Sequence, residues 1–523
     1  MSERHVVAAF CRDGGEVLLV RRSDDASPGR WDVPAGDAGN EIDRERVVRA
    51  AIHEATDLSS EAVTLVHGGE PIRVGSEDSE ADPDRADSTD HADGNCRTVH
   101  PFLFDVAIRE VTASSGAAHE WVPPTEIRRR ATVPWLWRAY ERVAPSIETI
   151  ETDREHGSAA LSVSALRALR DRAGVLADRT GDDRSREERP DGDRSVSAAA
   201  EASAAPESGD TEGDPAAGNG WRELATTARR LRDARPAMVV VGNRVNRAMA
   251  SADERSPRGV ERATQHAIER AASADTEAAT VAAEVLAERS HGGDGSDDGG
   301  PNSDGPGDCS NVADGRDGAG DGRSDGDVAA VSAGPRVLTL SRSGTVLETI
   351  RRLDPPPREV VIAESRPGGE GVGVAEELAP DYPTTLVADA GVASALRDLA
   401  VDAVLVGADT VFRDGSVSNK VGTRGTALAA AHEGVPVYVV AASAKVSLDF
   451  PIEADTEARD ATELYDGPLS DADLDVRNPT FDVTPREAVT GIATERGVLG
   501  SEAVAAIAEE FADIAAWDDR DGV

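Results

Sequence analysis

Five short apolar runs recur in the last third of the chain, with stretches of helical spacing between them. The runs are continuous rather than alternating, which is typical of strands buried on both faces of a sheet. Strands that alternate with helices favour a parallel arrangement, so residues 335–518 are predicted to form an α/β, doubly wound, Rossmann-like sheet. The predicted strands are 336–340, 360–363, 385–388, 403–406 and 437–441, and the predicted helices are 345–353, 374–378, 392–399 and 424–433.

Helical spacing dominates the middle of the chain. Trp221, Leu224, Ala228 and Leu231 fall on one helix face, and residues 221–290 are predicted to form a helical subdomain. Residues 148–177 are predicted to form a helix that docks on a globular part, with its arginines on the face opposite its leucines. Two polar stretches rich in Gly, Asp and Ser, 178–220 and 291–334, are predicted to be disordered linkers.

The N-terminal segment, residues 1–147, mixes strand and helix patterns. Strands are predicted at 5–10, 16–20 and 100–106, and a helix at 43–56. Residues 75–97 form an acidic insertion rich in Gly, Ser and Asp, which predicts a disordered loop.

Composition narrows the class of protein. The 523 residues carry a formal charge of -42, with 98 acidic against 56 basic side chains, as in proteins from a high-salt cytoplasm. This charge argues against a broad nucleic-acid-binding face. The three cysteines are far apart, which suits a reducing compartment. No signal-like start and no 18-residue apolar run is present, so we expect a cytoplasmic protein that does not cross a membrane.

The polar loop after the predicted strand 403–406 carries the densest candidate chemistry. Ligands bind in open α/β sheets at the carboxyl ends of the strands, where this loop begins. Gly422 and Thr423 are predicted to start a helix, whose free amides attract an anion. The candidate ligand-binding residues of the loop are Asp409, Asn419, Lys420, Gly422 and Thr423.

The two lysines of the chain, Lys420 and Lys445, both lie in this one unit, and every other basic side chain except histidine is arginine. Lysine is a compact point charge on a flexible stem, whereas arginine presents a fixed fork. Their shared location therefore indicates that a compact ammonium group is needed there.

The run GADTVFRDGSVSNKVGT resembles the signature of one family. That family contains the alpha, beta and delta subunits of translation initiation factor 2B, ribose-1,5-bisphosphate isomerase and methylthioribose-1-phosphate isomerase. The resemblance implies a phosphorylated sugar or nucleotide as ligand, a homo-oligomer formed through the sheet domain, and possible initiation-factor partners. It also assigns ligand contacts to Arg235 in an Arg-Pro step, to Arg366, and to Glu370, where the family has Gln.

Two departures from the family pattern bear on catalysis. The isomerases use a Cys and an Asp to move a proton, and their positions here are Ser341 and Asp409. A thiol is tunable to ionise near neutral pH, whereas a serine hydroxyl needs an activating base. The Arg-Gly-Ala turn of the isomerases is also missing, with residues 223–227 in its place. We therefore expect a binding protein related to the factor 2B subunits, with a working aldose–ketose isomerase that uses Asp409 and another base as the alternative.

The phrases VLLVRRS, GRWDVPAG, HPFLFDV and WVPPTEI resemble a Nudix domain, which implies an α/β/α sandwich over residues 1–147. Nudix hydrolysis needs several carboxylates to hold a divalent metal, and of that set Glu54 is the one well-placed residue. A packing or ligand-binding module is the favoured interpretation, with hydrolysis of a nucleoside diphosphate derivative as the alternative. No cofactor is expected, apart from a divalent metal at Glu54 if this half is active. No dinucleotide glycine fingerprint follows the first strand of the sheet domain.

Overall fold

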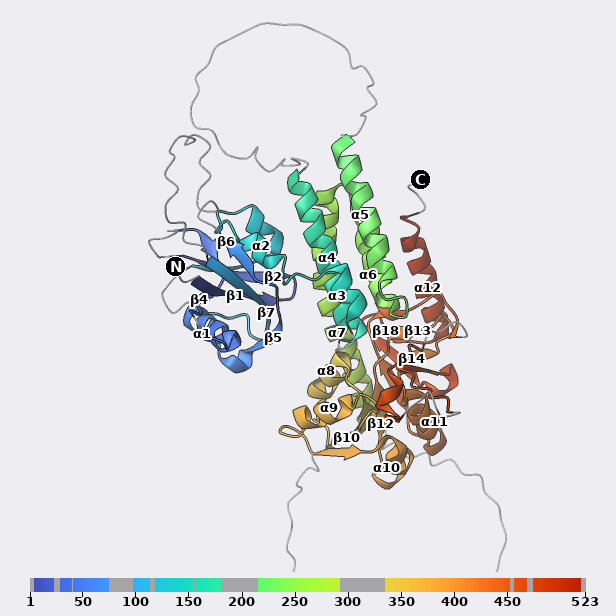
Figure 1. Cartoon of the computed structure of the whole chain (residues 1–523). Helices are drawn as coiled ribbons and strands as arrows, with labels where there is room; N and C mark the ends of the chain where they lie inside the picture. The colour runs from blue at the N-terminus through green and yellow to red at the C-terminus, as the bar shows by residue number, and fades with distance from the viewer. Residues whose placement is uncertain are drawn as a thin grey trace, which may run out of the picture.

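The computed structural model describes residues 4–22, 29–39, 41–74, 97–112, 118–153, 156–179, 215–291, 334–451, 456–467 and 474–518. These residues form an N-terminal α/β domain, a bundle of helices and a C-terminal sheet domain (Figure 1). The predicted linkers 178–220 and 291–334 and the predicted loop 75–97 lie mostly outside the described residues. Within the described stretches, no helix is both long and apolar enough to cross a bilayer.

The N-terminal domain is a mixed sheet with a helix on each face. Its elements are β1 (Arg4–Asp13), β2 (Glu16–Arg21), β3 (Trp31–Asp32), β4 (Ala35–Asp37), α1 (Arg44–Thr56), β5 (Val63–Gly68), β6 (Ile72–Val74), β7 (Arg97–Val106), β8 (His119–Val122), η3 (Pro124–Arg128) and α2 (Leu136–Tyr140). The main strand order is β3-β2-β1-β7-β5, with β1 parallel to β7 and antiparallel to β2. Along β1, Val7 and Ala9 pack with α1, whereas Ala8 and Phe10 pack with α2. The predicted α/β/α layering is therefore present.

The helical bundle begins earlier in the chain than predicted. Its helices are α3 (Ile147–Thr152), α4 (Ser158–Arg179), α5 (Pro215–Asp233), α6 (Val239–Ala250) and α7 (Pro257–His291). Leu166 and Leu169 of α4 share one core with Leu224 of α5 and Val245 of α6, so α4 belongs to the bundle and is not a separate docking helix. Helix α5 starts at Pro215, which lies inside the predicted linker 178–220.

The C-terminal domain is a doubly wound sheet of seven strands. Its main elements are β9 (Arg336–Leu340), α8 (Gly344–Arg352), β10 (Glu359–Ala363), α9 (Glu370–Leu378), β11 (Thr384–Val387), α10 (Val392–Asp398), β12 (Ala403–Val406), α11 (Thr423–Glu433), β15 (Val437–Val440), β17 (Gly491–Thr494), β18 (Gly497–Leu499) and α12 (Ser501–Ala515). The order is β11-β10-β9-β12-β15-β17-β18, parallel except for β18. Helices α7, α8 and α9 share a core with one face of the sheet, and α10, α11 and α12 share a core with the other.

A small antiparallel sheet replaces part of the loop predicted after β12. Its strands are β13 (Thr410–Val411), β14 (Val417–Lys420) and β16 (Phe481–Thr484). Lys420 is the last residue of a buried strand, so its predicted place in a loop is wrong. The prediction failed because the β14 sequence, VSNK, has no apolar run, and its pairing partner β16 lies about sixty residues further along the chain.

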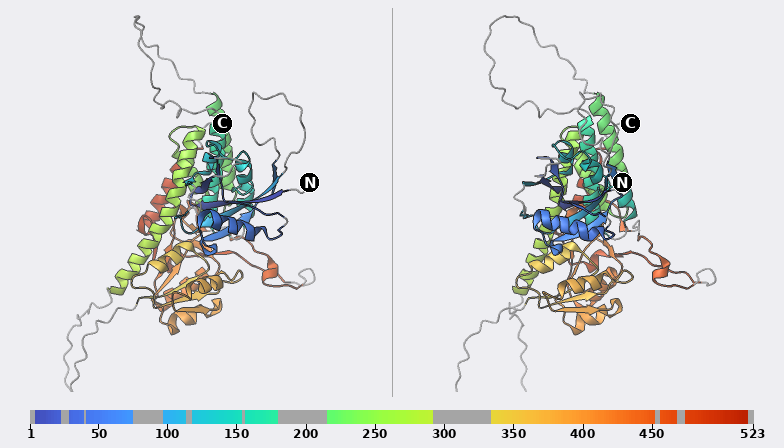
Figure 2. Two further views of the ribbon diagram at one scale, coloured as in Figure 1. Left: turned by 90° about the vertical axis from the view of Figure 1, so that its left-hand side faces the viewer. Right: turned by 60° about the vertical axis from the view of Figure 1, so that its left-hand side comes forward.

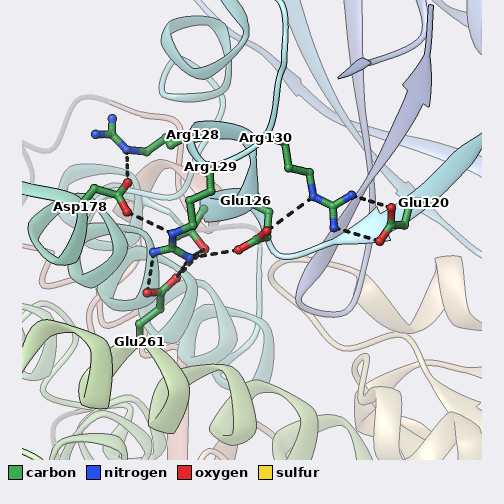
Figure 3. Close-up of polar contacts among 8 residues, drawn as sticks. Glu120, Glu126, Arg128, Arg129, Arg130, Asp178 and Glu261 are labelled. Atoms are coloured by element: carbon green, nitrogen blue, oxygen red, sulfur yellow. Dashed lines mark hydrogen bonds and ion pairs between the residues drawn. The ribbon is translucent and has the colours of Figure 1, made fainter. Parts of the chain in front are cut away.

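The N-terminal domain docks on α4 and α7 through charged side chains (Figure 3). Both guanidinium Nη atoms of Arg129 lie 2.8 Å from the carboxylate oxygens of Glu261 on α7. Thr125 donates a hydrogen bond of 2.6 Å to Glu261, and Asp178 of α4 accepts one of 3.1 Å from Arg129. The approach is close, because a Cβ added to Gly174 of α4 would lie 2.3 Å from the Thr125 methyl group.

One arginine of α4 is buried at this junction, although the sequence pattern places the arginines on the helix face opposite the leucines. Arg170 is 1% exposed, and its Nε donates a hydrogen bond of 2.9 Å to Asp171. It also donates to the carbonyl of Gly15 in the β1–β2 turn and, at 3.1 Å, to Gln265 of α7. A buried guanidinium is tolerated because these acceptors replace water around it.

Candidate ligand-binding site

A cavity of about 900 Å³ lies between the helical bundle and the sheet domain. The loops after β9 and β12 line it, and these neighbouring strands mark the point where the strand order reverses. Open α/β sheets bind ligands at such a point, because the loops on its two sides lead in opposite directions. The start of α4 and the middle of α7 form the wall from the bundle. Its charged and polar wall residues include His156, Ser158, Arg235, Asp275, Ser341, Arg342, Glu348, Glu370, Asp409, Asn419, Lys420, Lys445, Glu457, Arg459, Asp460 and Glu463.

Most of the residues proposed from the sequence line this cavity together. They come from the bundle, from the ends of four strands or the segments after them, and from a helix start, and are Arg235, Ser341, Glu370, Asp409, Asn419, Lys420 and Lys445. Their convergence from separate parts of the chain supports a single binding site. The roles assigned to them individually remain predictions.

Three proposed residues do not line the cavity. Arg366 is exposed and pairs with Glu364 at 3.2 Å. The amide of Gly422 donates to the Asp482 carboxylate at 2.7 Å, so a carboxylate of the chain itself binds the start of α11. The Thr423 hydroxyl is buried and donates to the carbonyl of Lys420 at 2.6 Å. The predicted anion contact at this helix start is therefore wrong, because neither Gly422 nor Thr423 faces the ligand space.

The two lysines face the same cavity, and each has a partner. Lys420 Nζ lies 2.5 Å from Glu370 Oε1 at the start of α9. Lys445 is buried and donates to the carbonyl of Ala408. Burial lowers the pKa of Lys445, while the nearby Asp409 carboxylate partly opposes this. The site therefore combines one ion-paired ammonium group with one that burial makes easier to deprotonate.

Asp409 is held from the bundle by a contact that the sequence did not reveal. Ser158, the first residue of α4, donates a hydrogen bond of 2.8 Å to Asp409 Oδ1 and is 1% exposed.

Ser341 has a φ of 57°, a left-handed conformation that is uncommon in residues other than glycine. The amide of Ser341 donates to Ser365 Oγ at 2.5 Å, which fixes this backbone. Strained backbone of this kind is concentrated at binding and catalytic sites.

Arg235 lies between the bundle and the segment after β15 rather than on the surface. It is 6% exposed and donates to the carbonyl of Asp153 at 2.6 Å. Its other Nη lies 3.3 Å from Glu457 Oε1. The proposed replacement for the Arg-Gly-Ala turn, residues 223–227, lies within α5 and does not line the cavity. Residues 156–158, at the start of α4, do line the cavity. The sequence feature that could have indicated this turn is a glycine directly before a helix with clear apolar periodicity.

Two residues of the cavity wall have buried polar atoms without hydrogen-bond partners among the described residues. These atoms are Glu370 Oε2 and Asp275 Oδ1, and Arg244 Nη2 is a third such atom beside Asp275. Arg244 is on α6, and its Nη2 lies 3.8 Å from Asp275 Oδ1, too far for a hydrogen bond. Since buried polar groups are nearly always satisfied, these atoms indicate that a ligand or water completes the site. Sequence reasoning missed Asp275 and Arg244, because both lie on helices outside any recognisable motif.

The predicted metal residue stands apart from this cavity. Glu54 is exposed on α1 of the N-terminal domain. Across the described stretches, no group of three or more His, Cys, Asp or Glu side chains is arranged to hold a metal ion. The resemblance to Nudix domains and a metal at Glu54 stay predictions.

The fold is that of an α/β protein with a cavity at a topological switch point, between the sheet and a helical bundle. Residues 326–501 match the Initiation factor 2 subunit family. The chain is 39% identical over 189 residues to methylthioribose-1-phosphate isomerase 2 of Trypanosoma cruzi (strain CL Brener), covering 32% of this chain and 49% of the relative. It is 38% identical over 188 residues to methylthioribose-1-phosphate isomerase of Drosophila pseudoobscura pseudoobscura, covering 32% and 52%. The chain thus spans about half the length of the curated relatives it matches.

Two solved structures are similar at lower identity. The translation initiation factor eIF-2B of Pyrococcus horikoshii OT3 is 21% identical with a TM-score of 0.44, covering 68% of this chain and 94% of the other. The 5-methylthioribose 1-phosphate isomerase of the same organism is 18% identical with a TM-score of 0.43, covering 76% and 90%.

Proposed function

We propose that this chain is a factor 2B-like protein that binds a phosphorylated sugar or nucleotide in the cavity without efficient isomerase chemistry. The observation that carries the proposal is the pair formed by Ser341 and Asp409. Ser341 supplies a hydroxyl where the isomerases have a thiol, and a hydroxyl ionises far less readily. Asp409 already accepts a hydrogen bond from Ser158, which holds its carboxylate in one orientation.

Binding itself is supported by the shape and chemistry of the cavity. A volume of about 900 Å³ accommodates a sugar phosphate or a nucleotide. Asn419, Lys420 and Arg235 bring nitrogen donors to the wall, where each also bonds within the chain, to Thr423, Glu370 and Asp153 respectively. An oligomer formed through the sheet domain and translation-factor partners belong to the same proposal, as implications of the family resemblance.

A working aldose–ketose isomerase is the second candidate. Lys445 has a lowered pKa and lies in the field of Asp409, so this pair brings a base and an acid to one cavity. The name of the Trypanosoma cruzi relative describes the same class of reaction.

The test measures binding and turnover separately. The full chain, in molar potassium chloride, is titrated with ribose 1,5-bisphosphate and with methylthioribose 1-phosphate by calorimetry, and ketose product is followed in parallel. We expect binding without turnover for the native chain and for Asp409→Asn. Turnover that Asp409→Asn abolishes would establish the isomerase instead, and the absence of any binding would remove the proposal.

A further inference from the structure

We propose that Glu370 determines which ligand the cavity accepts, favouring one with few negative charges that presents a hydroxyl or ammonium donor beside Lys420. This inference rests on the proposed function, since it concerns the ligand of the same cavity. Its basis is that the Glu370 carboxylate occupies the place on Lys420 that a ligand phosphate would take.

The contact between these two side chains is short and sheltered. Lys420 Nζ lies 2.5 Å from Glu370 Oε1, and the lysine side chain is 8% exposed. Glu370 is also the first residue of α9, where the amides of the helix start favour a negative charge. A ligand phosphate that approached Lys420 would meet this carboxylate, whose side chain is 33% exposed, and would have to displace it from the buried ammonium group.

The second carboxylate oxygen of Glu370 indicates that the ligand brings a hydrogen-bond donor to the site. Glu370 Oε2 is buried and has no hydrogen-bond partner among the described residues. Asp275 Oδ1, which faces the same cavity from α7, also has no hydrogen-bond partner, and Arg244 Nη2 lies 3.8 Å from it. A buried acceptor without a hydrogen bond is stabilised by a ligand donor, whereas a second acceptor placed beside it repels it and leaves it without a hydrogen bond. A hydroxyl or an ammonium group on the ligand fits both atoms, and a phosphate oxygen fits neither.

The other cationic side chains of the wall also have partners. Arg459 pairs with Glu463 at 2.7 Å, and Arg342 pairs with Glu377 at 2.5 Å. Arg235 has Glu457 beside it. The wall carries seven carboxylates against five lysine and arginine side chains. Its charge therefore favours a ligand with one phosphate over a ligand with two, because each phosphate must compete with a carboxylate already in place.

The experiment compares two sugars on two variants. Ribose 5-phosphate and ribose 1,5-bisphosphate are titrated by calorimetry into the full-length native chain and into Glu370→Gln, which removes the charge and keeps the shape. We expect the native chain to prefer the monophosphate, and the ratio of the two Kd values to shift toward the bisphosphate by about tenfold or more in Glu370→Gln. Glu370→Ser serves as a second variant if Glu370→Gln folds poorly by circular dichroism.

Glu376→Gln is the matched control. It removes a carboxylate from the same helix, α9, and Glu376 is exposed and does not line the cavity. We expect its Kd ratio to match the native one. Equal ratios in the native chain, Glu370→Gln and Glu370→Ser would overturn the role of Glu370 and leave the proposed function standing. No binding of either sugar to any variant would refute the proposed function itself.

Discussion

Two buried groups of charged side chains, one at the domain junction and one in the cavity wall, differ in how completely they are matched. At the junction, both oxygens of Glu261 accept from Arg129, and one of them also accepts from Thr125. In the cavity wall, Glu370 and Asp275 each keep an oxygen without a hydrogen-bond partner. Completed hydrogen bonding is what a structural contact needs, whereas open acceptors are what a ligand needs. The difference is what we expect if the junction is a fixed joint and the cavity is the proposed ligand-binding site.

The largest expected effect comes from removing the most buried member of the junction. Arg170→Ala should lower the free energy of unfolding by about 3–5 kcal/mol, because it leaves Asp171 short of a partner and opens a void. Urea unfolding followed by tryptophan fluorescence measures it. Arg172→Ala on the same helix, where the side chain is 38% exposed and pairs with Glu223, is the control and should change little. Equal losses in the two variants would contradict the assignment of Arg170 to a fixed joint.

A smaller effect is expected from weakening the bidentate contact. Glu261→Gln should lower the free energy of unfolding by about 1.5–3 kcal/mol, because a neutral amide replaces a carboxylate that two Arg129 nitrogens contact. It should also speed proteolytic release of the N-terminal domain. Glu120→Gln removes a carboxylate whose partner, Arg130, lies nearer the surface, and we expect both measurements to stay at the native value (Figure 3). A native rate of proteolysis in Glu261→Gln would mean that the joint is held by other contacts.

The smallest effect concerns a matched carboxylate near the C-terminal end of the described chain. Hydrogen bonding from Arg229 lowers the pKa of Asp518 below its usual value. Its stabilisation is therefore present above the unfolded pKa, about 3.9, and is lost as the pH falls through the lower folded value. Asp518→Asn should cost about 1 kcal/mol at pH 7, and the cost should shrink as the pH falls below the unfolded pKa of about 3.9. Thermal unfolding across this range tests it, and a cost that does not shrink on acidification would exclude the charge as its cause.

The predicted fold agrees best with the structure where the sequence signal is local. The five apolar runs correspond to β9, β10, β11, β12 and β15. Four of them are buried on both faces and are therefore apolar along nearly their whole length, whereas β11 is a partly exposed edge strand. Strand β14 was missed because polar side chains and a distant partner strand define it. Helix α4 was recognised as a helix but not as part of the bundle, because its partners α5, α6 and α7 lie beyond residues 180–214.

The residues of the candidate site also divide into those with a local sequence signal and those defined by tertiary contacts. Lys420, Asn419 and Asp409 were found because they share one contiguous motif, and they do share one cavity. Ser158 and Asp275 were not found, because each is a single polar residue on a helix, and its role depends on which strand ends it faces. The error at Gly422 arose because a helix start attracts any carboxylate, and Asp482, which reaches it from β16, lies sixty residues away in sequence.

Helix α7 contacts all three parts of the molecule. It has 35 residues, so it is about 50 Å long, and Figure 2 shows it running from the bundle to the sheet domain. Glu261 near its start binds the N-terminal domain, Asp275 at its middle faces the cavity, and Leu286 near its end packs on the sheet. A rigid rod anchored at three points transmits a tilt at one end to the others. Cutting away residues 1–147 would therefore alter the ligand space, although that segment contributes none of the wall residues named above.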